Sequence, residues 1–527
     1  MSPFTSSPAW RALLAHRDAM ASTTLAQLWE SDPGRGAALT IPCAGLAVDF
    51  SKQRITAETL GLLAALARER GLPEAIERLF TGGEVNVTEH RAALHTALRG
   101  DELVSVDGVD VRAEIRRYHE RMRVFAEAVR EGHWKGATGA RFTHVLALGI
   151  GGSSQGPRLA IEALAAEADG PEVRFVSNID AAEFDDAIRR LDPASTLVVV
   201  ASKTFSTQET MANAVAAREW ICASLGESAL GHHMTAGTAN TKAAVDWGLP
   251  ECNVFPFGEW IGGRYSLWSS VGLPIAIAIG MARFEQLLAG AHAADLQFRS
   301  DPLERNAPAL LGLVAIWNRN ALGIASNAVL PYASRLGSFP AYVQQIEMES
   351  NGKRVTAEGE AIDFPTSPVV WGGVGTPGQH AFHQWLHQGS EVASCDFVVV
   401  ADAMGSNASH HEILLAHACA QSEALLNGVA ASDAYRACPG NRPSTTLVMP
   451  RLDPYHLGAL LACCEHKVFT EATIWGVNAF DQFGVELGKS IAERVLPAVR
   501  GAEVALHPAT RHLLDVIHRL ASPAPRT

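Results

Sequence analysis

The sequence has no excess of basic residues. Its 43 lysines and arginines face 56 aspartates and glutamates, which gives a formal net charge of -13. A surface that binds nucleic acid or an anionic membrane needs a basic patch, so this balance argues against both kinds of partner. An anionic substrate is still compatible with an acidic protein where a few local donors overcome the overall field.

The sequence also lacks long apolar runs, and residues 1–20 do not show the pattern expected of a leader peptide. The most apolar stretch, residues 271–282, spans about 12 residues and is interrupted by Pro274, whereas a membrane-spanning helix needs roughly 20. Residues 1–20 carry Arg11, Arg17 and Asp18 without the basic-then-apolar order of a signal peptide. We therefore expect no membrane association and a cytoplasmic location.

The histidines and cysteines lack the spacing of a metal site. Eight cysteines include no Cys-x-x-Cys pair, so we expect reduced thiols and neither a zinc site nor a disulfide framework. His380, His383 and His387 recur at helical spacing, but no carboxylate-rich motif lies beside them. Residues 411–412 (His-Glu) lack the second histidine of the His-Glu-x-x-His motif. We expect no bound metal.

The composition is that of a globular protein with a large core. Of the 527 residues, 47% are hydrophobic and 19% charged, which excludes a largely disordered chain. A length of this size predicts several domains.

Short apolar runs alternate with helical stretches from residue 143 onward. Residues 145–148, 173–176 and 196–200 are nearly all apolar, as in strands that are buried on both faces of a parallel sheet. Residues 397–401 and 445–449 repeat the pattern. We predict an α/β fold with two doubly wound parallel-sheet domains and helical extensions at both ends.

The domain boundaries follow from these changes in the residue pattern. We expect a helical N-terminal extension over 1–115, a first α/β domain over 116–285, a second over 300–490, and a C-terminal helix and tail over 491–527. In the first extension, Thr56 and Thr59 are helix start signals.

Two of the predicted strands end in loops rich in glycine and hydroxyl groups. Residues 149–154 read Gly-Ile-Gly-Gly-Ser-Ser, and residues 201–207 read Ala-Ser-Lys-Thr-Phe-Ser-Thr. Glycines let the backbone approach an anion, and N–H groups at a following helix start donate to it. A dinucleotide fingerprint would need glycine at Ser154, and an ATP-binding P-loop would need glycine at Phe483. The pair of loops therefore favours a phosphate group outside a nucleotide.

Residues 344–353 read Gln-Gln-Ile-Glu-Met-Glu-Ser-Asn-Gly-Lys. Glu347 and Glu349 precede a Ser-Asn-Gly turn signal in an otherwise apolar, helical region. A carboxylate at such a break can project into a cleft. The alternative is that both side chains only solvate a helix end.

Six motifs, in this order along the chain, resemble those of the glucose-6-phosphate isomerase family. They lie at 149–153, 202–210, 262–268, 344–353, 378–380 and 484–489. The resemblance runs from about residue 80 to about residue 495. The sequence departs from the family pattern at Pro377, where asparagine is typical, and at His383, where an aromatic residue is common.

The resemblance implies a glycolytic and gluconeogenic enzyme that reversibly converts glucose 6-phosphate to fructose 6-phosphate by ring opening and a cis-enediol. It implies that Glu349 moves the proton between C1 and C2, and that Arg264 faces the developing enediolate. His380 and Lys489 would open the ring. The implied substrate-binding residues are Gly152, Ser153, Ser202, Lys203, Thr204, Thr207, Gln345 and Gln482.

The resemblance further implies no cofactor and a homodimer in which His380 reaches the partner's site. Two alternatives stay open: an isomerase of another phosphosugar, and a non-catalytic sugar-phosphate sensor, which would keep the loops without needing the acid and base residues. His95 is either close to the active site or simply packed.

Overall fold

The computed structural model describes residues 3–106 and 108–521, and its first sheet contains five parallel strands in the order β6-β5-β7-β8-β9. Apolar runs form these strands, as predicted for 145–148, 173–176 and 196–200. The strands are β5 (His144–Leu148), β6 (Glu172–Val176), β7 (Thr196–Ala201), β8 (Met234–Thr238) and β9 (Val254–Pro256).

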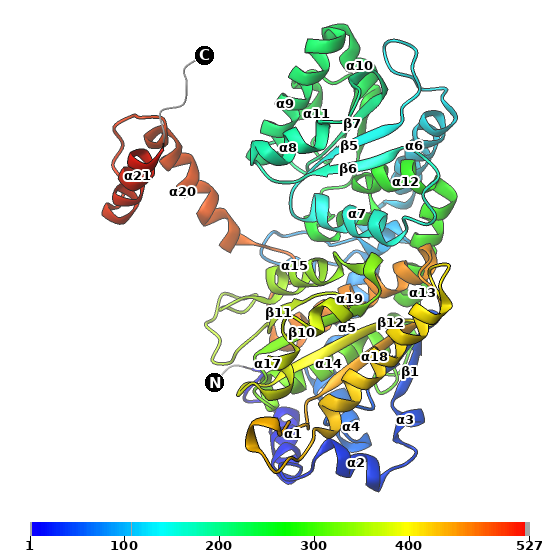
Figure 1. Ribbon diagram of the computed structural model, residues 1–527, viewed down its shortest axis with the longest axis vertical. Coiled ribbons are helices and arrows are strands. Elements are labelled where there is room, and N and C mark those ends of the chain that lie inside the picture. The colour runs from blue at the N-terminus through cyan, green and yellow to red at the C-terminus, as the bar shows by residue number, and fades with distance from the viewer. Residues whose placement is uncertain (1–2, 107, 522–527) are drawn as a thin grey trace. The chain divides into compact units, whose positions relative to one another are not determined.

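Helices cover both faces of this sheet (Figure 1). Alternate residues of a strand point to opposite faces, so Val198 packs toward one helical layer and Val199 toward the other. One layer consists of α8 (Ala181–Ile188), α9 (Gln208–Leu225) and α11 (Thr241–Asp246), and the other of α6 (Arg112–Glu131), α7 (Gly152–Ala163) and α12 (Leu273–Ile279). The doubly wound α/β architecture is confirmed for this part of the chain.

The second sheet has six strands in the order β1-β2-β13-β12-β10-β11. Its parallel strands are β10 (Ser326–Tyr332), β11 (Val369–Gly372), β12 (Ala393–Val400) and β13 (Ser444–Met449). One face packs on α17 (His383–Gln388) and α18 (Ala408–Asn427), and the other on α14 (Ala307–Ile316), α15 (Phe339–Asn351) and α19 (Pro454–Trp475).

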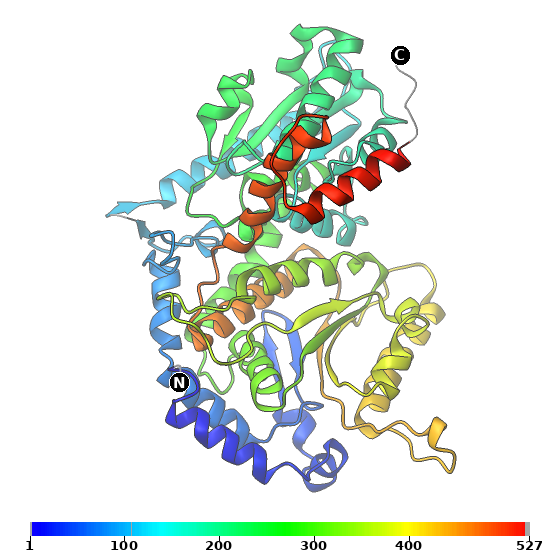
Figure 2. The same ribbon diagram turned by 90° about the vertical axis from the view of Figure 1, so that its left-hand side faces the viewer.

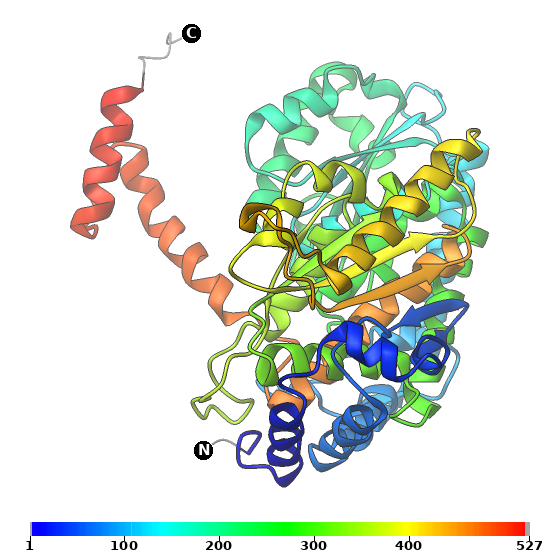
Figure 3. The same ribbon diagram turned by 60° about the horizontal axis from the view of Figure 1, so that its bottom comes forward.

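The N-terminal segment contributes an antiparallel hairpin to this second sheet. Strands β1 (Thr40–Cys43) and β2 (Leu46–Asp49) pair with each other, and β2 adds to β13 (Figure 3). Sequence patterning predicted only helices here, because each strand has four residues and Pro42 interrupts the first. Proline is tolerated on an edge strand such as β1.

Five helices complete the N-terminal segment: α1 (Pro8–Ala19), α2 (Leu25–Ser31), α3 (Arg35–Ala38), α4 (Ala57–Glu69) and α5 (Leu72–Thr81). Helix α4 starts where the sequence indicated, because Thr56 and Thr59 form a capping box at its N-terminus. A short ribbon follows, made of β3 (Ser105–Val106) and β4 (Val109–Asp110).

Helix α15 lies between the two sheets in both side views (Figures 1 and 2). It packs against α7 of the first domain and against α19, which in turn packs along α13 (Met281–Ser300). A side chain on α15 can therefore face either the first domain or the core of the second.

Residues 481–527 form a separate unit from residues 1–480. Within it, the described residues form α20 (Phe483–Val499) and α21 (Pro508–Leu520), two amphipathic helices with exposed apolar residues such as Leu487 and Leu513. Among the helices of 3–106 and 108–521, none combines the length and apolarity needed to cross a membrane.

Candidate active site

The two hydroxyl-rich loops leave the same edge of the first sheet. Leu148, the last residue of β5, is the register partner of Val200 near the end of β7. The first loop leads into α7, and the second leads through Thr207 into α9. At this edge, two helices therefore present their N-termini and the positive ends of their dipoles, which favour an anion.

The second loop brings its predicted ligands together. The Oγ atom of Ser202 lies 3.4 Å from Oγ1 of Thr207, and Ser206 donates to Oγ1 of Thr204 at 2.8 Å. Phe205 adopts a left-handed φ of 52° between them, which costs a non-glycine residue roughly 1–2 kcal/mol. Its ring is buried in the core of the first domain, and this burial anchors the turn that gathers the hydroxyls.

Lys203 lies in a partly desolvated, charged environment. Burial lowers the pKa of Lys203 to about 8, and Arg91 nearby acts in the same direction, while Glu89 and Glu259 oppose it. Arg91 forms an ion pair of 2.6 Å with Glu89. Sequence analysis assigned no role to these two residues, and the charged side chains of residues 84–91 are the signal that could have found them.

Close backbone packing joins the first loop to the Arg264 segment. A side chain on Gly152 would collide with the carbonyl of Gly263, and one on Gly151 would come within 3.1 Å of Nε2 of Gln345. Gly151 also has φ and ψ of 57° and -127°, a combination that glycine alone adopts readily. These glycines let the α7 N-terminus approach both Arg264 and α15.

Glu349 and Arg264 meet where α15 faces the first domain. Oε1 of Glu349 lies 3.6 Å from Nη1 of Arg264, and the two side chains are 22% and 1% exposed. Gln345, one helical turn earlier, donates to Oε2 of Glu349 at 3.0 Å. Arg264 donates through Nε to Oγ of Ser350 at 2.7 Å and through Nη2 to the carbonyl of Ala479. A partly accessible carboxylate thus lies beside a buried, fixed cation.

Sequence reasoning missed the residues that support Arg264. Oη of Tyr265 lies 2.9 Å from Oγ of Ser350, and burial raises the pKa of Tyr265 to about 12, so the phenol stays protonated. His95 stacks on the Tyr265 ring at 4.7 Å, and burial lowers the pKa of His95 well below its usual range. His95 is therefore a neutral, packed side chain behind the site.

The chain leads away from Glu349 on its way to His380. His380 caps the C-terminus of α16 (Gly375–Gln379), after β11, and its side chain is exposed. Helix α15 connects the parallel strands β10 and β11, so it runs antiparallel to them, and Nε2 of Gln344 donates to the carbonyl of Val370 at 2.8 Å. Glu349 lies about 7.5 Å beyond Gln344, toward the C-terminus of α15. From Val370, the chain to His380 runs toward the C-terminus of β11, which is the opposite direction.

The other two histidines of the same segment have a common partner. Nδ1 of His383 lies 2.9 Å from Oε1 of Gln421, and Nε2 of His387 lies 2.8 Å from the same oxygen. His383 is buried, and burial lowers its pKa. The departure from the family pattern at position 383 therefore packs a neutral histidine against α18.

Gln482 and Lys489 belong to the C-terminal unit. Gln482 caps the N-terminus of α20, and Lys489 is exposed seven residues later. Their approach to Glu349 remains a prediction.

The chain matches the sequence pattern of the family described as phosphoglucose isomerase over residues 49–514. A glucose-6-phosphate isomerase of Methylococcus capsulatus is 46% identical, with 96% of this chain and 97% of the relative aligned. One from Anaeromyxobacter sp. is 48% identical, with 97% and 96% aligned. A crystal structure of a glucose-6-phosphate isomerase from Chlamydia trachomatis aligns with a TM-score of 0.87 at 31% identity, covering 98% of this chain and 100% of that one.

Proposed function

The chain belongs to the phosphoglucose isomerase family, and from this premise we propose that it interconverts glucose 6-phosphate and fructose 6-phosphate. The observation that carries the proposal is the pair formed by Glu349 and Arg264, with 3.6 Å between Oε1 and Nη1. Moving a proton beside a carbonyl needs an accessible base and a cation that faces the developing negative charge. This pair offers both.

In the proposed reaction, Glu349 removes the proton from C2 of the open-chain aldose and returns it to C1. The intermediate is a cis-enediol, and Arg264 stabilises the negative charge that develops on its oxygen. The aldose and the ketose have the same oxidation level, so the isomerisation needs no redox cofactor. We expect no metal requirement either.

The phosphate group is proposed to bind at the edge of the first sheet. Hydroxyls, an ammonium and two helix N-termini are gathered there, and they hold the far end of the substrate so that C1 and C2 meet Glu349. Gln345 would contact the sugar beside Glu349. The proposed phosphate ligands are Gly152, Ser153, Ser202, Lys203, Thr204 and Thr207.

Ring opening is assigned to His380 and Lys489, with Gln482 as a further substrate contact. Because Glu349 and the chain to His380 lead in opposite directions from the Gln344 contact, we propose that His380 serves the Glu349 of a second copy in a homodimer. Trp385, 37% exposed and close to His380 in the chain, supports this surface as an interface, since aromatic residues are enriched at such contacts.

The proposal extends to compartment and domain roles. All eight cysteines are free, although Sγ of Cys43 lies only 3.3 Å from Sγ of Cys463. Adjacent thiols that stay reduced fit the cytoplasm. Residues 116–285 would bind phosphate and residues 300–490 would carry the proton transfers, with 1–115 and 491–527 as extensions.

A coupled assay with fructose 6-phosphate tests the proposed reaction, with mannose 6-phosphate and glucosamine 6-phosphate as competing substrates. We expect turnover of fructose 6-phosphate to exceed that of the other two. Faster turnover of a competitor would indicate another phosphosugar isomerase. Binding of all three without turnover would indicate a sensor.

Complementation tests the shared site. Glu349→Gln protein is mixed with His380→Ala protein under conditions that exchange subunits, so a mixed dimer has one site with both residues intact. Activity should return to about half of the wild-type value per mixed dimer. No recovery despite demonstrated exchange, or full activity of a wild-type monomer, would contradict the shared site.

A further inference from the structure

Helix α15 has a functional face and a buried face. Gln345 and Glu349, four residues apart, lie on the face that meets Arg264. Glu347 and Asn351, also four residues apart, are both 0% exposed. At about 100° per residue, Glu347 and Glu349 project to nearly opposite sides of the helix. Whatever fixes the rotation of the buried face therefore fixes the position of Glu349.

The buried face is held by polar contacts to α19. Nζ of Lys467 lies 2.7 Å from Oε2 of Glu347 and 2.7 Å from Oε1 of Glu471. Nδ2 of Asn351 lies within hydrogen-bond distance of Oε1 of Glu347, of Oε2 of Glu471 and of the carbonyl of Val468. These contacts form a polar cluster between two helices that otherwise meet through apolar side chains.

The two carboxylates of the cluster have different roles. Lys467 and Glu471 both belong to α19, one turn apart, so their ion pair lies within one helix. The pair of Lys467 with Glu347 joins α19 to α15. The pKa of Glu471 is raised well above its usual range, first by burial and then by Glu347, whereas the pairing with Lys467 lowers the pKa of Glu347 despite its burial. Glu347 is thus the carboxylate through which the ammonium reaches α15.

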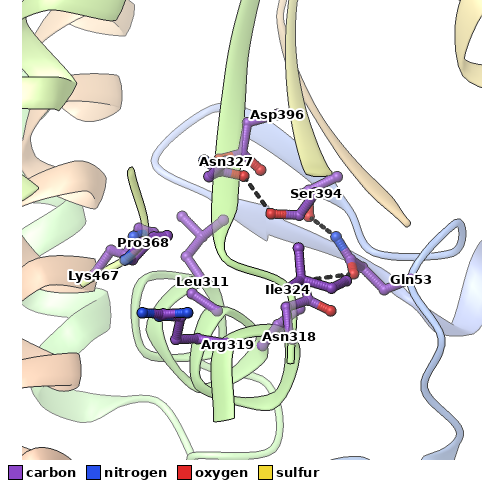
Figure 4. A pocket seen from close by; sticks show the side chains of 13 residues that line it. Gln53, Leu311, Asn318, Arg319, Ile324, Asn327, Pro368, Ser394, Asp396 and Lys467 are labelled. Atoms are coloured by element: carbon purple, nitrogen blue, oxygen red, sulfur yellow. Dashed lines mark hydrogen bonds between the residues drawn. The ribbon is translucent and has the colours of Figure 1, made fainter. Parts of the chain in front are cut away.

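The remaining surroundings of Lys467 are also buried. Lys467 lines a cavity of about 20 Å³, together with Asp396, Asn327 and Ser394 (Figure 4). That volume suits a water molecule and excludes a sugar phosphate. Asp396 accepts from Asn327 at 2.7 Å, and burial raises its pKa. Cys464, the other titratable group near Lys467, also has its pKa raised by burial, to about 12. The ion pair that links the ammonium to α15 is therefore the one with Glu347.

We propose that Lys467 and Glu347 are positioning residues for the isomerisation: their ion pair fixes the rotation of α15 about its axis and so holds Glu349 beside Arg264. The inference rests on the proposed function. An apolar contact at this place would bind the two helices at least as well, because buried ion pairs rarely add stability over well-packed hydrophobic residues. Directional contacts from one ammonium define the rotation of α15 about its axis, which apolar packing alone does not.

The expected loss of turnover follows from how precisely the Glu349 carboxylate must be placed. A side-chain tip lies about 5–6 Å from the helix axis, so a rotation of roughly 10° moves the Glu349 carboxylate by about 1 Å. A misplacement of that size can lower turnover by about 100-fold. The phosphate loops lie in the first domain, so a rotation of α15 should alter substrate affinity only through the Gln345 contact, and by less than it alters turnover.

The test compares Glu347→Gln with Glu471→Gln. Both residues are fully buried and contact the same ammonium, but only Glu347 forms an ion pair between the two helices, whereas Glu471 reaches α15 by accepting from the amide of Asn351. With fructose 6-phosphate as substrate, we expect Glu347→Gln to lose about 10- to 100-fold in kcat, with KM within about threefold of the wild type. Glu471→Gln should keep kcat within about threefold. Equal losses in the two variants, or a larger loss in Glu471→Gln, would overturn the inference.

A second variant shows whether a loss of activity could come from unfolding alone. The triple variant Lys467→Met, Glu347→Leu, Glu471→Leu buries no unpaired charge, so it should unfold at a temperature no lower than the wild type. Its kcat should nevertheless fall by about 10- to 100-fold with KM nearly unchanged. A folded triple variant with wild-type kcat would show that the cluster is only structural. Absence of turnover in the wild type would refute the proposed function itself, which is a separate result.

Discussion

Raising the pH should weaken substrate binding through Lys203, and arginine at this position should abolish the effect. Burial lowers the pKa of Lys203 to about 8, so the positive charge is present below this pH and is lost above it. About 90% of the side chains are charged at pH 7 and about 10% at pH 9. The substrate phosphate, with a second pKa near 6, is already about 90% doubly ionised at pH 7, so its charge changes little across this window. If only the ammonium binds phosphate, KM should rise about tenfold between pH 7 and pH 9.

Initial rates measured with fructose 6-phosphate at several pH values separate KM from kcat. Lys203→Arg keeps its charge above pH 9 and should show a flat KM, while Lys203→Gln should show a raised KM at every pH. A wild-type KM that is equal at pH 7 and pH 9 would refute the reasoning. So would an alkaline rise that persists in Lys203→Arg, because that rise would come from another group.

Three further substitutions test other parts of the site. Arg264→Lys should lower kcat by about 10²–10³-fold, because lysine cannot keep the fixed multi-point contacts that aim the charge; a steady-state kcat within threefold of wild type would contradict this. Thr207→Ala should weaken a phosphosugar inhibitor by about 1.5–3 kcal/mol in titration calorimetry, and unchanged affinity would move the phosphate elsewhere. Gly152→Ala should lower the free energy of unfolding in urea by about 1–3 kcal/mol, because the alanine side chain would collide with Gly263. The control is Gly61→Ala, whose side chain would meet open space. Equal stability of these two glycine variants would argue against the collision.

Several strands of the two sheets could be predicted because they are nearly continuous apolar runs. Residues 397–401 are all apolar and residues 196–200 contain one threonine, and such runs are typical of central parallel strands. The β1–β2 hairpin could not be predicted, since four-residue strands give too short a pattern and one of them contains Pro42. Its place beside β13 depends on a contact between residues about 400 positions apart.

In the candidate site too, the features set by local sequence could be predicted, and those set by tertiary contacts could not. Residues 344–353 were enough to single out Glu349, but the alternative that its neighbour Glu347 only solvates a helix end is wrong, because Glu347 is 0% exposed. Its partner Lys467 lies 120 positions away, and no spacing in the sequence links the two. The roles of His380 and Lys489 stay predictions that depend on a second chain and on the C-terminal unit.

The exchange of the C2 proton of glucose 6-phosphate with solvent deuterium tests most directly whether Glu349 is the isomerase base. The measurement follows the loss of the C2 proton signal by NMR for wild type and for Glu349→Gln, which keeps size and hydrogen bonding but removes basicity. We predict exchange by the wild type and a rate lower by about 10²–10⁴-fold in the variant, with the affinity for a phosphosugar inhibitor retained. Exchange by the folded variant at near the wild-type rate would contradict the account.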